Sequence, residues 1–125
     1  MELRDKVVVI TGGSGGIGKA MAIAFLQEGA KAIMLADLNE EAVKQAAAEI
    51  GCDGMACDVT DEAQIVALVE ATGAERGAID VFCSNAGAGG SGLLTEAENA
   101  VWQQQWELHV MAHLYAARAV LPGML

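Results

Sequence analysis

The feature that most constrains the fold is a glycine-rich segment that directly follows a run of branched apolar residues near the start of the chain. Residues 7–10 read Val-Val-Val-Ile, and the next segment is Thr11-Gly12-Gly13-Ser14-Gly15-Gly16-Ile17-Gly18. A continuous apolar run predicts a strand that is buried on both faces. Residues 19–27 favour a helix, so we expect the order strand, glycine turn, helix. Unpaired amide groups at such a helix N-terminus suit a pyrophosphate.

Three of the glycines have separate expected roles. Gly12 allows a turn where a Cβ would clash, Gly16 lets the backbone approach a ligand, and Gly18 lets helix and strand pack closely. The position of the segment, after a buried strand and before a helix, favours nucleotide binding over a simple flexible turn. A P-loop is excluded because Ala20, not Ser or Thr, follows Lys19.

Apolar runs and helical patterns alternate along the rest of the chain. We expect strands near residues 6–11, 33–36, 54–57 and 79–83, with helices over 15–27, 39–50 and about 60–73. Asn39 and Thr60 are expected N-caps, and Thr95 with Glu98 predicts a capping box before a last helix. The order βαβαβαβα predicts an α/β fold with a doubly wound, Rossmann-type parallel sheet in strand order 3-2-1-4. Its ligand crevice would lie where the strand order reverses.

Size and composition set the class of protein. The 125 residues correspond to one domain, residues 1–125, and the net charge of −10 argues against nucleic acid as a partner. Cys52, Cys57 and Cys83 are odd in number and lack zinc-ligand spacing, which favours reduced cysteines in a cytoplasmic protein. No apolar stretch is long enough for a signal peptide or a membrane span, so we expect no membrane association.

Asp37 follows the second apolar run, nineteen residues after Gly18. A dinucleotide site needs an acceptor at about this spacing for the ribose hydroxyls. A carboxylate there would also repel a 2′-phosphate, so the sequence predicts NAD in preference to NADP. The alternative is an ordinary surface aspartate that opens the second helix.

The segment Thr11-Gly12-x-x-x-Gly16-Ile17-Gly18 resembles the cofactor fingerprint of the short-chain dehydrogenase/reductase family. Asp58-Val59 resembles the family's adenine-contacting pair, and Ser84-Asn85-Ala86-Gly87 resembles its Asn-Asn-Ala-Gly segment. In that segment Asn85 would tie neighbouring strands. Gly15 and Leu38 stand where NADP-preferring relatives often carry Arg or Lys. The resemblance implies cofactor contacts at Gly12, Ser14, Gly16, Ile17, Gly18, Asp37, Leu38, Asp58, Val59, Asn85, Ala86 and Gly87.

The chain also departs from the family pattern. His109 stands where the family carries an asparagine that helps a proton relay, and His113 follows one turn later. Two histidines without a third ligand nearby argue against a metal site. The family's proton donor is a tyrosine followed four residues later by a lysine, with a serine upstream. Tyr115 is the only tyrosine and residue 119 is alanine, so Tyr115 is interpreted as a packing residue.

The resemblance implies the N-terminal, cofactor-binding half of an oxidoreductase that acts on alcohols or ketones. The catalytic Ser/Tyr/Lys half would be absent, and the chain alone would have little or no turnover. The alternative is a non-catalytic nucleotide-sensing or assembly module on the same scaffold. A methyltransferase-like domain is disfavoured because the glycine loop follows Thr11 rather than an acidic residue. We also expect self-association through the unpaired edge of residues 81–83 or through the last helix, where Trp102 and Trp106 would form a core or interface stripe.

Overall fold

The computed structural model describes residues 1–90 and 92–125. Within them one parallel sheet holds four strands in the order β3-β2-β1-β4, as predicted. β1 pairs with β2 and with β4, and β2 pairs with β3. The strands are β1 (Val7–Thr11), β2 (Ala32–Asp37), β3 (Asp53–Ala56) and β4 (Val81–Cys83). The order reverses between β1 and β4, which places the expected crevice at the end of these two strands.

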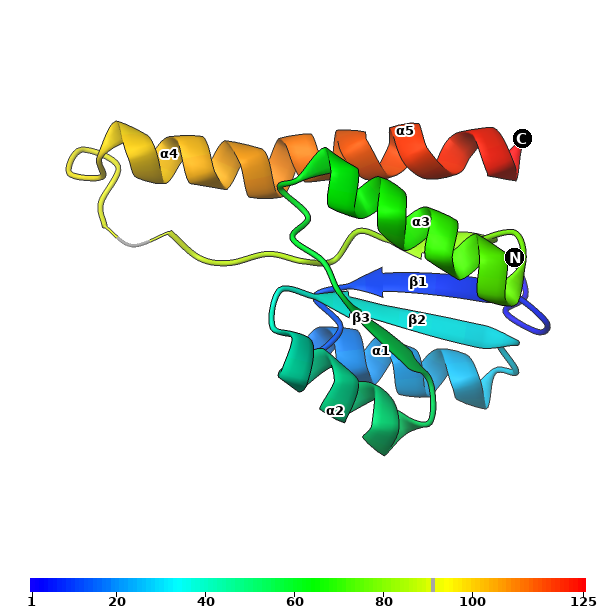
Figure 1. Ribbon diagram of the computed structural model, residues 1–125. Coiled ribbons are helices and arrows are strands. Elements are labelled where there is room, and N and C mark those ends of the chain that lie inside the picture. Colours follow the sequence, from blue (N-terminus) through cyan, green and yellow to red (C-terminus); the bar gives the residue numbers. More distant parts are fainter. Residues whose placement is uncertain (91) are drawn as a thin grey trace.

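Helices cover both faces of the sheet (Figure 1). One face carries α1 (Gly16–Gln27) and α2 (Glu40–Ile50), and the other carries α3 (Glu62–Arg76) and α5 (Ala112–Met124). A long connection after β4 leads to α4 (Asn99–Trp106), which continues through a π-helical turn, η1 (Glu107–Met111), into α5. The result is three layers with the sheet in the middle.

Alternating side chains of the central strands explain this layering. Val8 and Ile10 of β1 point to the face that α1 and α2 cover, and Val7 and Val9 point to the opposite face. All four side chains are buried, so the apolar run does form a strand that is covered on both sides. The two apolar clusters are therefore separated by the sheet and joined through β1 and β2.

The structure corrects three of the expected helix boundaries. Asp61, not Thr60, caps α3 by accepting a hydrogen bond from the Ala63 amide, because the Thr60 hydroxyl is bound to Asp58 instead. α3 also continues to Arg76, beyond the predicted end near residue 73. The predicted capping box is wrong: α4 begins at Asn99, and Glu98 makes no side-chain capping bond. The other predicted N-cap, Asn39, is confirmed by its bond to the Ala42 amide.

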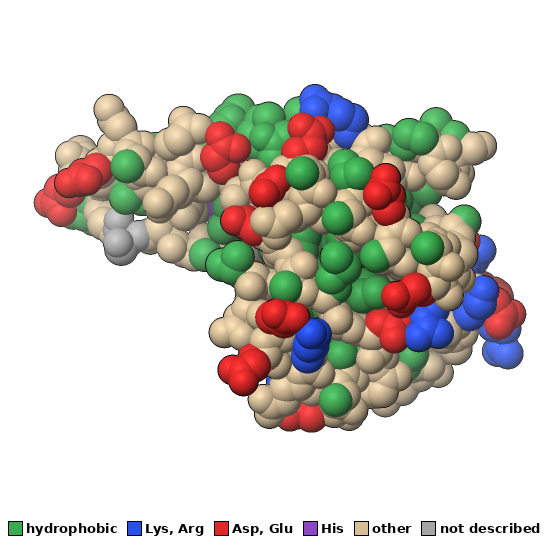
Figure 2. Space-filling view, in the orientation of Figure 1, with side chains coloured by type: hydrophobic (Ala, Val, Ile, Leu, Met, Phe, Trp, Pro, Cys, Tyr) green, Lys and Arg blue, Asp and Glu red, His purple; other side chains and the backbone are tan. Residues whose placement is uncertain are grey.

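The last helix buries a different face from the one that the expected stripe of Trp102 and Trp106 would place in the core. Trp102 and Trp106 are 49% and 54% exposed, so they are not core residues, and the helix is buried instead along the face of Ala112, Ala116 and Val120. Apolar side chains consequently reach the surface over this helix (Figure 2). In the described residues β4 pairs only with β1. Self-association through either surface stays a prediction.

Candidate functional site

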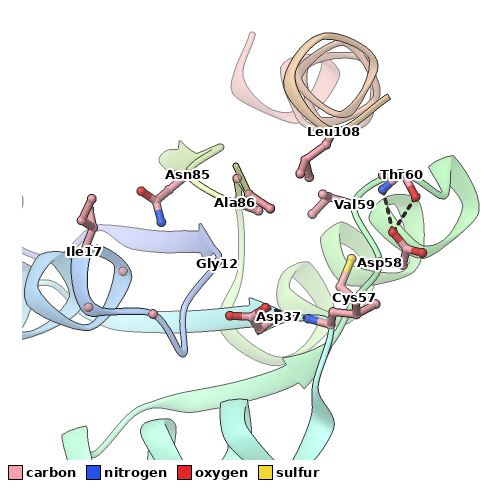
Figure 3. Close-up of a pocket in the computed structure, with 16 residues that line it drawn as sticks. Gly12, Ile17, Asp37, Cys57, Asp58, Val59, Thr60, Asn85, Ala86 and Leu108 are labelled. Atoms are coloured by element: carbon pink, nitrogen blue, oxygen red, sulfur yellow. Dashed lines mark hydrogen bonds between the residues drawn. The ribbon is translucent and has the colours of Figure 1, made fainter. Parts of the chain in front are cut away.

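A cavity of about 700 Å³ lies at the carboxyl ends of the strands, where the strand order reverses (Figure 3). Four chain segments and one helical side chain form its wall. They are the glycine loop, the end of β2, the segment after β3, the loop after β4, and η1. The lining residues are Gly12, Gly15, Gly16, Ile17, Gly18, Asp37, Leu38, Cys57, Asp58, Val59, Thr60, Asn85, Ala86, Gly87, Ala88 and Leu108.

Gly12 and Gly18 shape the glycine loop. Gly12 has φ +67°, and a Cβ there would lie 2.9 Å from Cα of Ala86, so both conformation and space require glycine. A Cβ on Gly18 would overlap the carbonyl oxygen of Gly12. The predicted close approach at Gly18 is therefore found, but its partner is the start of the loop rather than the strand. Nothing lies near a Cβ built on Gly16, which faces open space.

The start of α1 is open toward the cavity. Gly15 is its N-cap and has no side chain that could bind the first amides, and the first turn carries no acidic residue. Unpaired amides and the positive end of the helix dipole make this terminus suitable for an anion. Ile17, 71% exposed, stands beside it on the cavity wall. The lining residues include no Lys or Arg, so no cationic side chain among them would hold a phosphate at this terminus.

Thr11 holds the loop after β4 in place. Its hydroxyl is buried and accepts hydrogen bonds from the amides of Asn85 (3.0 Å) and Ala86 (3.1 Å), while it donates to the carbonyl oxygen of Cys83 (3.4 Å). The Asn85 side-chain amide donates to the carbonyl oxygen of Thr11 at 3.0 Å. The expected tie between neighbouring strands is therefore present, and it sets the position of Asn85, Ala86 and the glycine that follows.

Asp37 is held at the end of β2 by three donors. Its Oδ2 accepts hydrogen bonds from the Ser14 amide (3.0 Å) and the Ser14 hydroxyl (2.5 Å), and its Oδ1 accepts one from the Leu38 amide (2.8 Å). Leu38 beside it is 71% exposed. The carboxylate is thus fixed on the cavity wall, and the glycine loop is linked to the second strand.

Asp58, after β3, has a similar arrangement. Its Oδ1 accepts hydrogen bonds from the Thr60 amide (2.9 Å) and the Thr60 hydroxyl (2.6 Å), as the dashed lines in Figure 3 mark. The Asp58 amide donates to Oε1 of Gln64 at 2.9 Å. Val59 lies beside it, and Leu108 extends from η1 toward Val59 and Ala86 in the same view. This end of the cavity therefore offers an apolar surface beside a carboxylate.

Two histidines contact the loop after β4 from the last helix. Nε2 of His109 lies 3.0 Å from the carbonyl oxygen of Ala88, which makes Nε2 the protonated donor. Nδ1 of His113 lies 2.6 Å from the Ser84 hydroxyl, a contact that no sequence pattern predicted. Among the described residues, no group of three or more His, Cys, Asp or Glu side chains could hold a metal ion.

The cysteines near the sheet have depressed reactivity. Burial raises the pKa of the Cys57 thiol to about 11, with a smaller contribution from the charges of Asp58 and Asp61. Burial also raises the pKa of Cys83. Because the thiolate is the nucleophile, neither side chain is suited to covalent catalysis.

The structure brings the sequence-predicted site residues together with one exception. All of them line the cavity except Ser14, which reaches it only through Asp37. Sequence reasoning missed five lining residues: Gly15, Cys57, Thr60, Ala88 and Leu108. Four of these adjoin a predicted site residue in the chain, which was a usable signal. Leu108 lies far from the other lining residues in the sequence, on a later helix, so no local sequence pattern could have identified it.

Comparisons with known proteins agree with this geometry. The sequence profile described as short chain dehydrogenase matches residues 6–125. The chain is 35% identical over 128 aligned positions to 2-(S)-hydroxypropyl-CoM dehydrogenase 3 of Xanthobacter autotrophicus, covering 98% of this chain and 50% of that protein. It is 42% identical to a (+)-cis,cis-nepetalactol synthase of Nepeta racemosa, with 69% of this chain and 33% of the relative aligned.

A solved structure shares the fold closely. The short chain dehydrogenase/reductase of Burkholderia phymatum, crystallised in complex with NAD, superimposes with a TM-score of 0.93 at 32% identity. The match covers 100% of this chain and 46% of that one. The chain therefore spans about half the length, or less, of these relatives. Within residues 1–90 and 92–125, no helix is long and apolar enough to cross a membrane.

Proposed function

This chain belongs to the short-chain dehydrogenase family, and we propose that its cavity binds a dinucleotide coenzyme, NAD in preference to NADP. The observation that carries the proposal is the meeting of an open helix N-terminus and a fixed carboxylate in one cavity at the reversal of strand order. Since segments from residue 12 to residue 108 build this cavity, we treat residues 1–125 as one coenzyme-binding domain.

The proposed pose follows the order of the strands. The pyrophosphate would lie on the first amides of α1, beside Gly16 and Ile17. The adenosine half would lie over β2 and β3, with its ribose at Asp37 and its adenine between Leu38 and the Asp58-Val59 pair. The nicotinamide half would then extend over β1 and β4, along the loop of Asn85, Ala86 and Gly87 that the buried Thr11 hydroxyl holds.

The preference for NAD rests on charge. A 2′-phosphate at the ribose would approach the Asp37 carboxylate, and no lining residue carries a positive charge to compensate for the repulsion. The vicinal hydroxyls of NAD, in contrast, are hydrogen-bond donors that suit a carboxylate.

The chemistry that we propose for the whole protein is hydride transfer between the nicotinamide and an alcohol or ketone carbon. Bound NAD supplies the hydride-accepting ring, and this chain orients it through the loop after β4. The sequence has Ala119 four residues after Tyr115, so residues 1–125 contain no Tyr-x-x-x-Lys pair to deliver a proton. We therefore propose that these residues alone bind the coenzyme with little or no turnover.

Isothermal titration calorimetry with NAD and NADP tests the proposal. We expect one site for NAD, and an affinity for NADP that is lower by about tenfold or more, since each 1.4 kcal/mol of repulsion changes affinity by that factor. Asp37→Ala should weaken NAD binding and reduce the difference between the affinities for NAD and NADP. Glu41→Ala removes an equal charge from the exposed side of α2 and should change neither affinity. Absence of NAD binding by the folded chain would refute the proposal.

Turnover tests whether residues 1–125 carry a catalytic base of their own. The same samples are incubated with NAD and a panel of secondary alcohols, and NADH is followed by absorbance. Binding without NADH formation fits a coenzyme-binding part that supplies no proton acceptor. Rapid NADH formation would instead mean that a residue of this chain, with His109 the first candidate, acts as the base.

A further inference from the structure

We propose that Ser84 and His113 are a pair of positioning residues that hold the loop after β4 in the conformation that receives the nicotinamide half of the coenzyme. The inference rests on the proposed coenzyme binding. It assigns a role to two side chains that do not themselves line the cavity.

The contact between these two side chains attaches the end of β4 to α5. Nδ1 of His113 lies 2.6 Å from Oγ of Ser84, the residue that directly follows β4. An unprotonated Nδ1 accepts the hydroxyl proton of Ser84, and a protonated Nδ1 donates to its oxygen. The bond therefore does not depend on which form of the imidazole ring is present.

Beyond Ser84 the chain runs along the last helix in the opposite direction (Figure 1). One turn before His113 in that helix, Nε2 of His109 donates to the carbonyl oxygen of Ala88 at 3.0 Å. A Cβ built on Gly87 would lie 2.9 Å from Cε1 of His109, so the backbone of the loop lies directly against the imidazole ring. The helix thus holds the loop at two points, residues 84 and 88.

The same alignment continues toward the start of the helix. A Cβ built on Gly90 would lie 3.5 Å from Cδ of Gln105 and 3.5 Å from Cγ1 of Val101. Val101, Gln105, His109 and His113 recur every four residues, the spacing of neighbours on one helix face. As the loop advances from residue 84 to residue 90, its contacts move back along this face. The helix face therefore sets the course of the loop.

The two polar contacts lie on either side of the loop residues that line the cavity, residues 85–87. The Thr11 hydroxyl holds the first two of these residues through their amides, from the side of β1. The last helix holds the segment from the other side. In the proposed pose the nicotinamide half extends along residues 85–87, so the Ser84–His113 bond fixes the surface that receives it.

This bond is made without ligand, so it acts by preorganisation. When the bond is removed, the loop samples further conformations, and coenzyme binding must then restrict them at a cost in affinity. If only a fraction of the chains holds the loop in the binding conformation, the apparent affinity falls by that fraction. A ligand that fills only the adenosine half does not touch this loop, so its affinity is independent of the bond.

Calorimetric titrations with NAD and with ADP separate the two halves of the site. ADP keeps the adenine, one ribose and the pyrophosphate, and it lacks the nicotinamide and its ribose. Ser84→Ala and His113→Leu each remove the bond, and each should weaken NAD binding by about two- to tenfold, the range that one hydrogen bond supplies. ADP affinity should be unchanged. The double variant should lose no more NAD affinity than either single variant, because both remove the same bond.

Conservative replacements separate the hydrogen bond from the bulk of the side chain. His113→Asn places an amide near the position of Nδ1, where it can accept or donate as the ring does, and it should restore NAD affinity. His113→Gln carries its amide out to the position of Nε2, away from Ser84, and should behave like His113→Leu. Gln103→Leu is the matched control, since it removes a side-chain bond to Glu107 within the same helix and should change neither affinity.

The outcomes distinguish this inference from the proposed function. If neither NAD nor ADP binds the wild-type chain, the proposed function itself fails. If both bind, and removal of the Ser84–His113 bond weakens both by the same factor or weakens neither, coenzyme binding stands and the positioning role is refuted. Additive losses in the double variant would refute it as well. Thermal melts identify any variant that fails to fold, and the other single variant of the pair then decides the comparison.

Discussion

Replacing the buried Thr11 hydroxyl with a methyl group gives the sharpest test of how this site is held together. Thr11 is 1% exposed, and its hydroxyl serves the amides of Asn85 and Ala86 and the carbonyl oxygen of Cys83. Thr11→Val keeps the branched shape and removes all three contacts. The Ala86 amide would then lose its acceptor in a partly buried position, whereas the Asn85 amide keeps a second acceptor, the carbonyl oxygen of Cys83 at 2.9 Å.

The magnitude follows from the Ala86 amide. Leaving a buried donor unsatisfied costs about 1–3 kcal/mol, and the loop can relax partly toward solvent. We therefore expect Thr11→Val to lower the free energy of unfolding by about 2 kcal/mol, a substantial share of the 5–15 kcal/mol that typical domains have. NAD binding should weaken too, because the displaced residues line the cavity.

Thr72→Val is the matched control. Thr72 is fully buried as well, but its hydroxyl donates only to the carbonyl oxygen of Leu68 one turn earlier in α3. That carbonyl keeps its helical partner, so we expect a loss below about 1 kcal/mol and unchanged NAD affinity. Urea unfolding followed by circular dichroism measures both variants. Equal losses for the two would contradict the role that we assign to the Thr11 hydroxyl.

Two further predictions concern the glycine loop and the cysteines. Gly18→Ala places a Cβ against the Gly12 carbonyl oxygen and should lower the melting temperature by several degrees, since about 4–8 °C corresponds to 1 kcal/mol in a small domain. Gly16→Ala meets no neighbouring atom, so this variant should melt like the wild type and show only weaker NAD binding. Burial raises the pKa of the Cys57 thiol to about 11, so the folded protein holds this proton more tightly than the unfolded chain does. The contribution of this difference to the free energy of unfolding is fully present below the unfolded pKa of the thiol, and it is lost as the pH rises through the folded value of about 11. Urea midpoints should fall between pH 9 and about 11, and less steeply in Cys57→Ala.

The sheet could be predicted from the sequence because its signals are local and repeated. β1, β2 and β4 are formed by apolar runs, and Asn39 and Gly51 lie at the two ends of α2, next to the boundaries that they set. Parallel strands joined by helices leave few topologies, so the order followed from general rules. The predicted site residues came together for the same reason, since each follows the carboxyl end of a strand.

The features that the sequence did not reveal depend on competition between local partners. Thr60 is a good N-cap by type, but its hydroxyl is bound to Asp58, and Asp61 caps the helix instead. Leu108, which lines the cavity, lies in the π-helical turn, and no residue pattern in the sequence predicted that turn. The Ser14–Asp37 and Ser84–His113 contacts join segments 23 and 29 residues apart.

The central place of β1 has a consequence for the order of folding. Its pairing with β2 joins segments about 25 residues apart, whereas its pairing with β4 closes a loop of about 70 residues. Contacts of such long separation form slowly, so we expect the β1–β4 ladder to be among the last to assemble on the pathway. The coenzyme pocket would be complete only after that step. A bound nucleotide would then lower the unfolding rate of the complete sheet far more than it would raise the folding rate.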